Sequence, residues 1–233
     1  TPDDIYGPQG VWEHLIPVVG DIDKDLTEEV VISYAGKLVV FNSDGTIQEG
    51  DWPQYHQRID AFGIPALADV DNDGDLEIFH GSWYGSVYAF HDDGTEVTGW
   101  PRFAESLSTA GSLSIADINN DGIMEIIMGS QSINTYYLYS FISAWDKQGN
   151  MLNGWPKPIG SVNPGDYWYR YISSPVVTDL EGDGIVDLVV GSSNGVIYVW
   201  DLQTEYLSGN LEWPQSHHDS QHTGYYGNTC TNP

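Results

Sequence analysis

The chain has 233 residues, 40% of them hydrophobic, which is enough to bury a core as one large domain or two small ones. It carries 34 acidic side chains against 7 basic ones, and the formal net charge of −27 excludes nucleic acid and anionic membrane surfaces as partners, because both require a basic face. No apolar run approaches the roughly 20 residues of a membrane helix, so no membrane insertion is expected. The opening TPDDIYGPQG is neither a signal peptide nor a Met start and indicates a processed or trimmed soluble chain.

A repeated acidic stretch organises the chain. GDIDKDLTEEVVISY begins its acidic run at Asp21, ADVDNDGDLEIFHGS at Asp69, ADINNDGIMEIIMGS at Asp117 and TDLEGDGIVDLVVGS at Asp179. The first two intervals are 48 residues and the third is 62, with the excess around SVNPGDYWYRY. Self-similarity at this period predicts an array of one supersecondary unit. We expect a single domain over residues 1–233, with repeats near 15–62, 63–110, 111–172 and 173–215 and a C-terminal tail at 216–233.

Short strands follow each acidic run. A β-rich segment (EEVVISY, LEIFHGS, MEIIMGS, VDLVVGS) leads through a turn into a second one (KLVVFNS, SVYAFHD, YLYSFISAWD, VIYVWD). These apolar runs are bounded by Gly, Asp and Asn, and no long segment keeps a helical period, so the chain is predicted to be all-β. Three or four strands per 48-residue unit indicate a β-propeller blade. A Trp-Pro pair recurs once per blade, which predicts a structural role, at Trp52, Trp100, Trp155 and Trp213.

Each acidic run has the spacing of a metal-binding loop. Oxygen side chains stand at positions 1, 3, 5 and 9 of a tight turn, and Gly74, Gly122 and Gly184 supply a bend at position 6. An all-oxygen cage favours Ca²⁺ over Mg²⁺, and the lack of imidazole or thiolate argues against zinc. The predicted side-chain ligands are Asp21, Asp23, Asp25 and Glu29 in loop 1; Asp69, Asp71, Asp73 and Glu77 in loop 2; Asp117, Asn119, Asp121 and Glu125 in loop 3; and Asp179, Glu181, Asp183 and Asp187 in loop 4.

Two other interpretations compete with a calcium loop. An EF-hand needs a bidentate Glu at position 12 and flanking helices, whereas position 12 lies inside predicted strands, at Ile32, His80, Met128 and Val190. Solvated turns would explain one isolated D-x-D-G string. Four copies in register, each with an acidic residue at position 9 before an apolar strand, instead favour metal binding. Loop 1 fits least well, because Leu26 replaces the Gly of position 6.

The pattern D-x-D-x-D-G-x-x-[DE], preceded by segments such as FGIPALADVDNDG and SSPVVTDLEGDG, resembles the FG-GAP/VCBS repeats of integrin-α-like β-propellers over about residues 15–215. The resemblance implies up to four Ca²⁺ ions in the blade hairpins, an extracellular location, and a carbonyl ligand at position 7. The closing WPQSHHDSQHTGYY is similar to the tail of secreted bacterial repeat domains. Such relatives usually close with about seven blades, so the four repeats form either a small closed propeller or an arc of a larger ring. The position 7 residues are Thr27, Asp75, Ile123 and Ile185.

No catalytic constellation remains once the acidic loops are assigned. GSSNG at residues 191–195 matches a hydrolase elbow, but it joins two strands, so Ser193 is interpreted as a turn residue and no enzyme is expected. His217, His218 and His222 form either a transition-metal site or a capping segment with incidental histidines. Cys230 either cross-links chains or is a free thiol of the tail.

Aromatic residues are concentrated in the longer third repeat, in YYLYSF at 136–141 and YWYRY at 167–171. Such side chains either pack between blades or present flat faces to a ligand, and Tyr167, Trp168 and Tyr169 are the candidate ligand residues. We therefore expect a secreted or cell-surface calcium-binding β-propeller that acts as a binding or adhesion module for a glycan or an extracellular protein. One alternative is a self-assembling subunit of an extracellular filament or sheath. Another is a non-catalytic accessory domain of a secreted polysaccharide lyase or protease.

Overall fold

The computed structural model describes residues 16–34, 37–55, 63–82, 85–104, 112–131, 140–159, 172–192 and 195–227. Across these ranges the chain is all-β, as predicted, with one 3₁₀ turn, η2, at Ser208–Asn210. None of the described segments forms a helix long and apolar enough to span a membrane.

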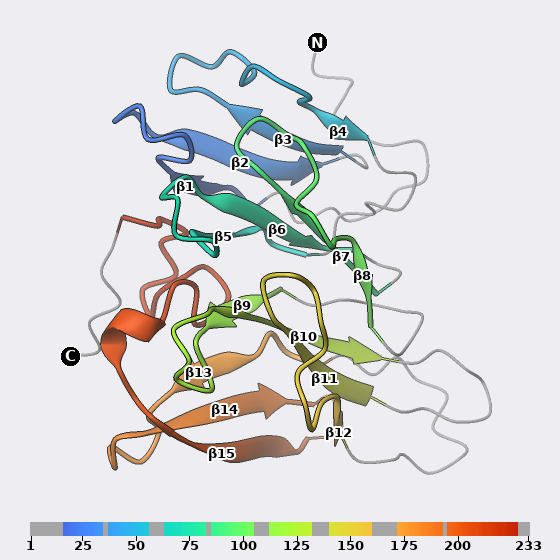
Figure 1. The fold of residues 1–233 in the computed structure, drawn as a ribbon, viewed down its shortest axis with the longest axis vertical. Coiled ribbons are helices and arrows are strands. Elements are labelled where there is room, and N and C mark those ends of the chain that lie inside the picture. The colour runs from blue at the N-terminus through green and yellow to red at the C-terminus, as the bar shows by residue number, and fades with distance from the viewer. Residues whose placement is uncertain are drawn as a thin grey trace.

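Four antiparallel sheets follow one another along the chain, and in each sheet the strands pair in sequence order (Figure 1). They are the blades of a β-propeller, as the sequence predicted. Blades 1, 2 and 3 have four strands, whereas blade 4 has three. The strands are β1 (Val18–Gly20), β2 (Glu29–Tyr34), β3 (Lys37–Phe41) and β4 (Gln54–Tyr55) in blade 1; β5 (Ala66–Ala68), β6 (Glu77–Gly81), β7 (Ser86–Phe90) and β8 (Arg102–Phe103) in blade 2; β9 (Ser114–Ala116), β10 (Glu125–Gln131), β11 (Ser140–Trp145) and β12 (Lys157–Ile159) in blade 3; and β13 (Val176–Thr178), β14 (Ile185–Gly191) and β15 (Ile197–Glu205) in blade 4.

The core lies between successive blades. Side chains alternate between the two faces of a strand, so each middle strand contributes apolar groups to both neighbouring blades. One buried cluster runs through blades 1 to 3, and a second joins blade 3 to blade 4. Strands β6 and β7 are therefore buried along their whole length. This explains why their sequences are almost continuously apolar.

Trp-Pro pairs connect a blade to the next one. The indole Nε1 of Trp52 donates a hydrogen bond to the carbonyl of Asp92 at 2.6 Å, and that of Trp100 donates to Lys147 at 3.1 Å. Both acceptors lie in the turn that follows the third strand of the next blade. The predicted structural role thus holds for these two residues, each of which fixes the spacing of two blades.

The first strands β1, β5, β9 and β13 lie side by side in chain order. The C-terminal segment 207–227 crosses three of them. Trp213 exchanges two backbone hydrogen bonds with Ile115 of β9, and the Pro214 carbonyl accepts from Val177 of β13 at 2.8 Å. Further along, the Gly224 carbonyl accepts from Val19 of β1 at 2.7 Å. The tail is therefore part of the propeller centre.

This path changes the role expected of Trp213. The sequence placed it with the other Trp-Pro pairs, but it is fully buried against β9 and contacts no following blade, because no fifth blade follows among the described residues. Blades 1 and 4 lie at opposite ends of the molecule in Figure 1. Ile197, on the side of blade 4 away from blade 3, is 71% exposed, so blade 1 does not cover that side and the described blades form an arc.

Candidate metal centre

The four acidic loops connect the first and second strands of the blades and share one backbone geometry. In each, the position 9 carboxylate folds back and accepts a hydrogen bond from the backbone N–H of position 2. The donor–acceptor distances are 3.1 Å for Ile22 to Glu29, 3.1 Å for Val70 to Glu77, 2.9 Å for Ile118 to Glu125 and 2.9 Å for Leu180 to Asp187. The position 9 side chain therefore closes the loop in all four blades.

Carboxylates at position 5 shape the turn from within. Each accepts a hydrogen bond from the backbone N–H two residues later, the Asx-turn geometry that Asp favours. The N–H groups of Thr27, Asp75, Ile123 and Ile185 are the donors, at 2.7, 3.0, 2.9 and 2.9 Å. The N–H of position 7 thus helps to close the turn, and the carbonyl ligand implied at position 7 stays a prediction. All four position 12 residues lie in strands, which excludes EF-hands.

Position 6 adopts a left-handed conformation in every loop. Gly74, Gly122 and Gly184 have φ of 89°, 82° and 84°, and Leu26 in loop 1 has φ of 72°. A side chain with a Cβ is strained there, whereas Gly is not. Leu26 is also 91% exposed, so burial of its side chain does not offset the strain. Loop 1 therefore has the same backbone conformation as the other loops, although Leu26 replaces the favoured Gly at position 6.

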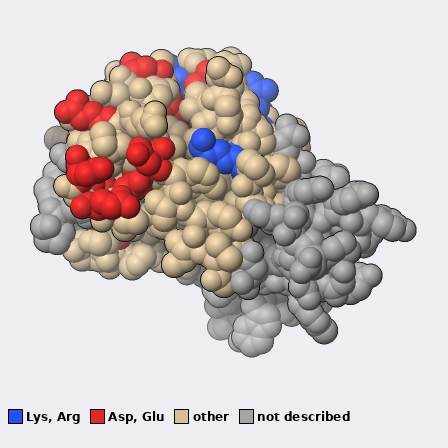
Figure 2. All heavy atoms as spheres, turned by 90° about the horizontal axis from the view of Figure 1, so that it is seen from below, with Lys and Arg blue, Asp and Glu red and all other residues tan. Residues whose placement is uncertain are grey.

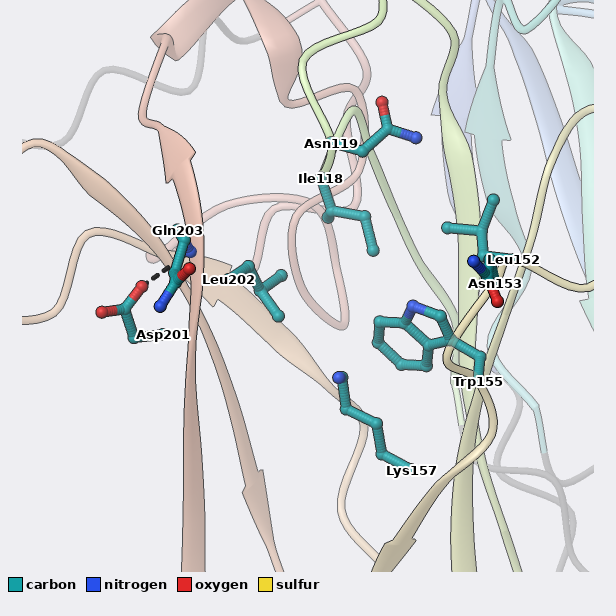
Figure 3. A pocket seen from close by; sticks show the side chains of 9 residues that line it. All are labelled: Ile118, Asn119, Leu152, Asn153, Trp155, Lys157, Asp201, Leu202 and Gln203. Atoms are coloured by element: carbon teal, nitrogen blue, oxygen red, sulfur yellow. Dashed lines mark hydrogen bonds between the residues drawn. The ribbon is translucent and has the colours of Figure 1, made fainter.

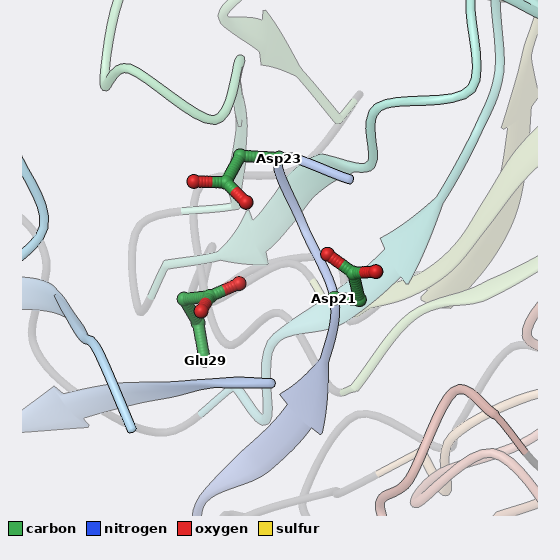
Figure 4. A group of neighbouring side chains, drawn as sticks. All are labelled: Asp21, Asp23 and Glu29. Carbon is green, nitrogen blue, oxygen red and sulfur yellow. The ribbon is translucent and has the colours of Figure 1, made fainter. Parts of the chain in front are cut away.

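Loops 1 and 2 bring three carboxylates together. Oxygens of Asp21, Asp23 and Glu29 lie within 4.8 Å of one another, and Figure 4 shows these side chains converging from the loop after β1 and the start of β2. The same positions of loop 2 form an equivalent group. The first carboxylate of each loop has a buried Oδ1 with no hydrogen-bond partner, in Asp21 and Asp69. A buried, unpaired carboxylate oxygen is costly, and a divalent cation would satisfy it. The donor set of these loops fits Ca²⁺.

Loops 3 and 4 satisfy their first carboxylate within the protein. Asp117 accepts from the N–H of Gly122 at 2.9 Å and from the amide of Asn210 at 3.2 Å. Asp179 accepts from three backbone N–H groups of its own loop. In loop 3 the Asn119 amide also donates to Glu125 at 3.1 Å. The first carboxylates of these two loops therefore have hydrogen-bond partners within the protein, and the described residues of loops 3 and 4 form no group of three converging carboxylates like those of loops 1 and 2.

Burial of the position 9 glutamates changes their acidity. The pKa of Glu77 and of Glu125 is raised to about 8, chiefly by desolvation and to a smaller extent by the neighbouring loop carboxylates, against the lowering effect of the backbone N–H bond. The pKa of Glu29 is also raised, chiefly by burial. Neighbouring negative charge and desolvation both disfavour the ionised form. A cation in the loop would reverse the balance, because it stabilises the carboxylates that bind it.

Some side chains beside the loops were not predicted from the sequence. The amide of Gln48 donates to Asp23 at 2.8 Å, and the imidazole Nδ1 of His91 lies 3.3 Å from a carboxylate oxygen of Glu77. Both residues follow the third strand of their blade. The sequence gives no signal for these contacts, since strand register sets them.

Other predicted sites remain separate from the loops. His218 is buried and packs edge-on against Trp213 with ring centroids 5.0 Å apart, and burial lowers its pKa. The rings of His217 and His222 lie 5.8 Å apart outside that core. The three histidines therefore do not converge as one site. The candidate ligand residues Tyr167, Trp168 and Tyr169, together with Ser193, Cys230 and most of YYLYSF, lie outside the described residues.

A pocket opens where the repeat pattern breaks, between blades 3 and 4 (Figure 3). Strand β15 continues for nine residues, with a bulge opposite Ile185–Asp187, where the equivalent chain of blades 1 to 3 turns back. Trp155 therefore lacks the turn that Trp52 and Trp100 bind. The resulting pocket has a volume of about 500 Å³. Sequence reasoning missed this pocket, although DLQTE in the fourth repeat lacks the D-G-T turn and was the available signal.

The Trp155 pocket combines an indole with polar groups. Its apolar wall is Trp155, Ile118, Leu152 and Leu202, and its polar groups are Asn119, Asn153, Lys157, Asp201 and Gln203. The Lys157 ammonium lies 4.7 Å from the centroid of the Trp155 ring, within cation–π distance. Figure 3 shows the indole and the lysine on one side of the pocket and Gln203 with Asp201 on the other.

The fold and the loops together define a β-propeller with acidic, metal-type hairpins. Residues 69–128, which contain loops 2 and 3, match the family model of the FG-GAP-like repeat. The predicted FG-GAP repeat is thus confirmed for residues 69–128.

Two solved structures give the extent of wider similarity. The V. cholerae biofilm matrix protein Bap1 is 16% identical over 79% of this chain and 41% of its own, with a TM-score of 0.32. BamB from Moraxella catarrhalis is 14% identical over 77% of this chain and 60% of its own, with a TM-score of 0.37. The chain thus spans less than two thirds of either protein, and neither score transfers an activity to it. No curated protein matches the sequence significantly.

Proposed function

We propose that this chain is an extracellular, calcium-stabilised β-propeller module that binds a glycan and has no catalytic role. The observation that carries the calcium part is the buried, unpaired Oδ1 of Asp21 and of Asp69 within a group of three carboxylates. The FG-GAP-like repeat at residues 69–128 supports both the metal and the location outside the cell.

Calcium has a structural role in this proposal. A bound Ca²⁺ supplies positive charge and flexible oxygen coordination. The loop residues hold it: Asp21, Asp23 and Glu29 in loop 1, and the equivalent residues of loop 2. Since Glu29 and Glu77 begin second strands, fixing their carboxylates also fixes the hairpin of each blade. Each ion also offsets two charges of a protein whose formal net charge is −27.

The calcium proposal is tested by thermal unfolding after EDTA dialysis and at increasing Ca²⁺, with Mg²⁺ as control. We expect a large Ca²⁺-specific rise in Tm that is lost when Asp23→Ala and Asp71→Ala are combined, because the pair removes one ligand from loop 1 and one from loop 2. Asp44→Ala, in an exposed turn of blade 1 outside the four loops, is the matched control and should keep the response. A Tm that does not change with Ca²⁺ concentration would mean that the loops are solvated turns.

The Trp155 pocket supports the glycan part of the proposal. Sugar rings pack their C–H faces on flat aromatic side chains, while their hydroxyl groups need hydrogen-bond donors and acceptors. The pocket offers the indole of Trp155 with the amides of Asn153 and Gln203. Its volume of about 500 Å³ falls in the range of small-molecule sites.

Glycan binding is tested on a glycan array with the calcium-loaded protein. We expect a defined set of glycans to bind, and Trp155→Ala to abolish that binding while the protein remains folded. Tyr55→Ala is the matched control, because Tyr55 is a 65% exposed aromatic residue of blade 1, remote in sequence from the pocket. Equal glycan binding by wild type and Trp155→Ala would show that the pocket is not the binding site. An array on which no glycan binds would contradict the glycan-binding proposal.

A further inference from the structure

Three side chains of each blade point at the blade that follows. They occupy position 2 of the acidic loop and two positions of the third strand that face one side in register. In blades 1 to 3 none of them is more than 4% exposed. They are Ile22, Leu38 and Val40 in blade 1; Val70, Val87 and Ala89 in blade 2; and Ile118, Ile142 and Ala144 in blade 3.

The equivalent side chains of blade 4 are open to solvent. Leu180, Ile197 and Val199 are 54%, 71% and 44% exposed. The equivalence follows from register, because Ile197 pairs with Gly191 as Ile142 pairs with Gly129. Blade 4 therefore presents the packing face of an interior blade, here called the far face, without a blade on it. Contiguous exposed apolar surface of this kind marks interaction sites.

Blade 1 presents the complementary half of the same contact. On its side away from blade 2, here called the near face, Val39 is buried, whereas Val30, Ile32 and Phe41 are half-buried. Their equivalents in the two following blades are fully buried against the preceding blade: Ile78, His80 and Phe90 in blade 2, and Ile126, Met128 and Trp145 in blade 3. The two ends of the chain thus carry the two halves of one blade interface.

We propose that the far face of blade 4 binds the near face of blade 1 in a second copy of this chain. The contact repeats, between two molecules, the packing that joins successive blades three times within one molecule. It pairs two different surfaces, so it is a head-to-tail interface that either closes into a ring or continues as a filament. This assembly goes beyond the proposed glycan-binding role and does not depend on it.

Charge sets the conditions for this association. Seen from the blade 4 end, Asp and Glu gather at one side of the face, and most of the described surface beside them carries no charge (Figure 2). Two copies with a formal net charge of −27 each repel one another at long range. Salt screens that repulsion, and any bound cation reduces it. Association is therefore expected to strengthen with ionic strength, and with Ca²⁺ beyond the effect of salt alone.

Sedimentation velocity of the full chain across a concentration series, with Ca²⁺ and salt, tests the proposal. We expect wild type to sediment as dimers or larger species. Ile197→Asp combined with Val199→Asp should give monomers with the Tm of dilute, monomeric wild type, because both side chains are exposed in the monomer. Phe103→Asp is the matched control: Phe103 is 63% exposed on β8 of blade 2, outside both end faces, and should leave association intact.

Mixing two defective variants tests the head-to-tail geometry. Ile32→Lys removes the near face, with Phe41→Lys as a second variant if the first lowers the Tm. Each variant alone should be monomeric, whereas a mixture of the far-face and near-face variants should form a dimer that grows no further, because one intact interface remains. Wild type that stays monomeric at all concentrations, or a far-face variant that assembles like wild type, would overturn the proposal.

Discussion

Blade 2 and blade 4 are built from similar sequences but differ in their surroundings. LEIFHGSWYGSVYAF and VDLVVGSSNGVIYVW have the same alternation and the same loop before them. In blade 2 both middle strands are buried on both faces, whereas β15 of blade 4 alternates between exposed and half-buried residues. The difference lies in the neighbours, because blade 2 is packed between two blades and blade 4 follows only one. The alternating sequence thus determines that the strands form, whereas the neighbouring blades determine which of their side chains are buried.

The sharpest test of this comparison substitutes one residue type at equivalent positions. Ile142 and Ile197 both pair with a Gly of the second strand, but Ile142 is fully buried and Ile197 is 71% exposed. Ile142→Ala should lower the free energy of unfolding by about 2–5 kcal/mol, through lost burial and a residual cavity. Ile197→Ala should change it by less than about 0.5 kcal/mol in the monomer. Urea denaturation at low protein concentration measures both, and equal losses would mean that blade 4 is covered in solution.

The next effect concerns pH in the calcium-free protein. The folded-state pKa of Glu77 and of Glu125 is raised from 4.5 to about 8, so their stabilising contribution is complete below the unfolded pKa and is lost as pH rises toward 8. Thermal unfolding in EDTA should therefore give a Tm that falls between about pH 4.5 and pH 8. Glu77→Gln and Glu125→Gln should flatten that slope.

Calcium supplies the control for the pH prediction. With Ca²⁺ in excess the loop carboxylates must be ionised to bind the ion, so the Tm should rise over the same pH interval. A Tm that falls equally with and without Ca²⁺ would show that the buried glutamates do not bind the ion.

A smaller effect distinguishes the first carboxylates of loops 2 and 4. Asp69 has a buried Oδ1 without a partner, whereas both oxygens of Asp179 accept backbone N–H groups of their own loop. Asp69→Asn should therefore remove more of the Ca²⁺-dependent stabilisation than Asp179→Asn, by about 1–3 kcal/mol, the scale of a buried polar group that loses its partner. Calcium titrations monitored by unfolding measure both losses. An equal loss would mean that the two loops contribute equally to the Ca²⁺-dependent stabilisation.

Local features of this molecule were predictable from the sequence. The hydrogen bonds that join two residues of the same loop span at most seven positions, as between Ile22 and Glu29, so spacing within a short segment specifies them. The same holds for the strands, whose alternation and flanking turns are local. The loop-and-strand pattern is a weak signal in one copy, but its recurrence in four copies was sufficient to predict the fold class.

Contacts between distant segments were not predictable. Trp213 pairs with Ile115, and the Asn210 amide bonds Asp117, 93 residues away, because the tail returns to the propeller centre. The Trp155 pocket arises from a missing turn in a different repeat. Such contacts depend on how blades are placed in space, and hydrophobic periodicity carries no information about that placement.

The smallest expected effect tests the one loop that lacks its glycine. Leu26 holds φ of 72° with 91% of its surface exposed, so Leu26→Gly should relieve left-handed strain without losing buried contacts. We expect the free energy of unfolding to rise by about 1 kcal/mol or less, since the greater entropy of Gly in the unfolded chain offsets part of the gain. Gly122→Ala, at φ of 82° with no atom near the added Cβ, is the matched reverse change and should lower it similarly. If both substitutions destabilise, side-chain contacts of Leu26 outweigh its backbone strain, and loop 1 differs from loop 3 in more than its glycine.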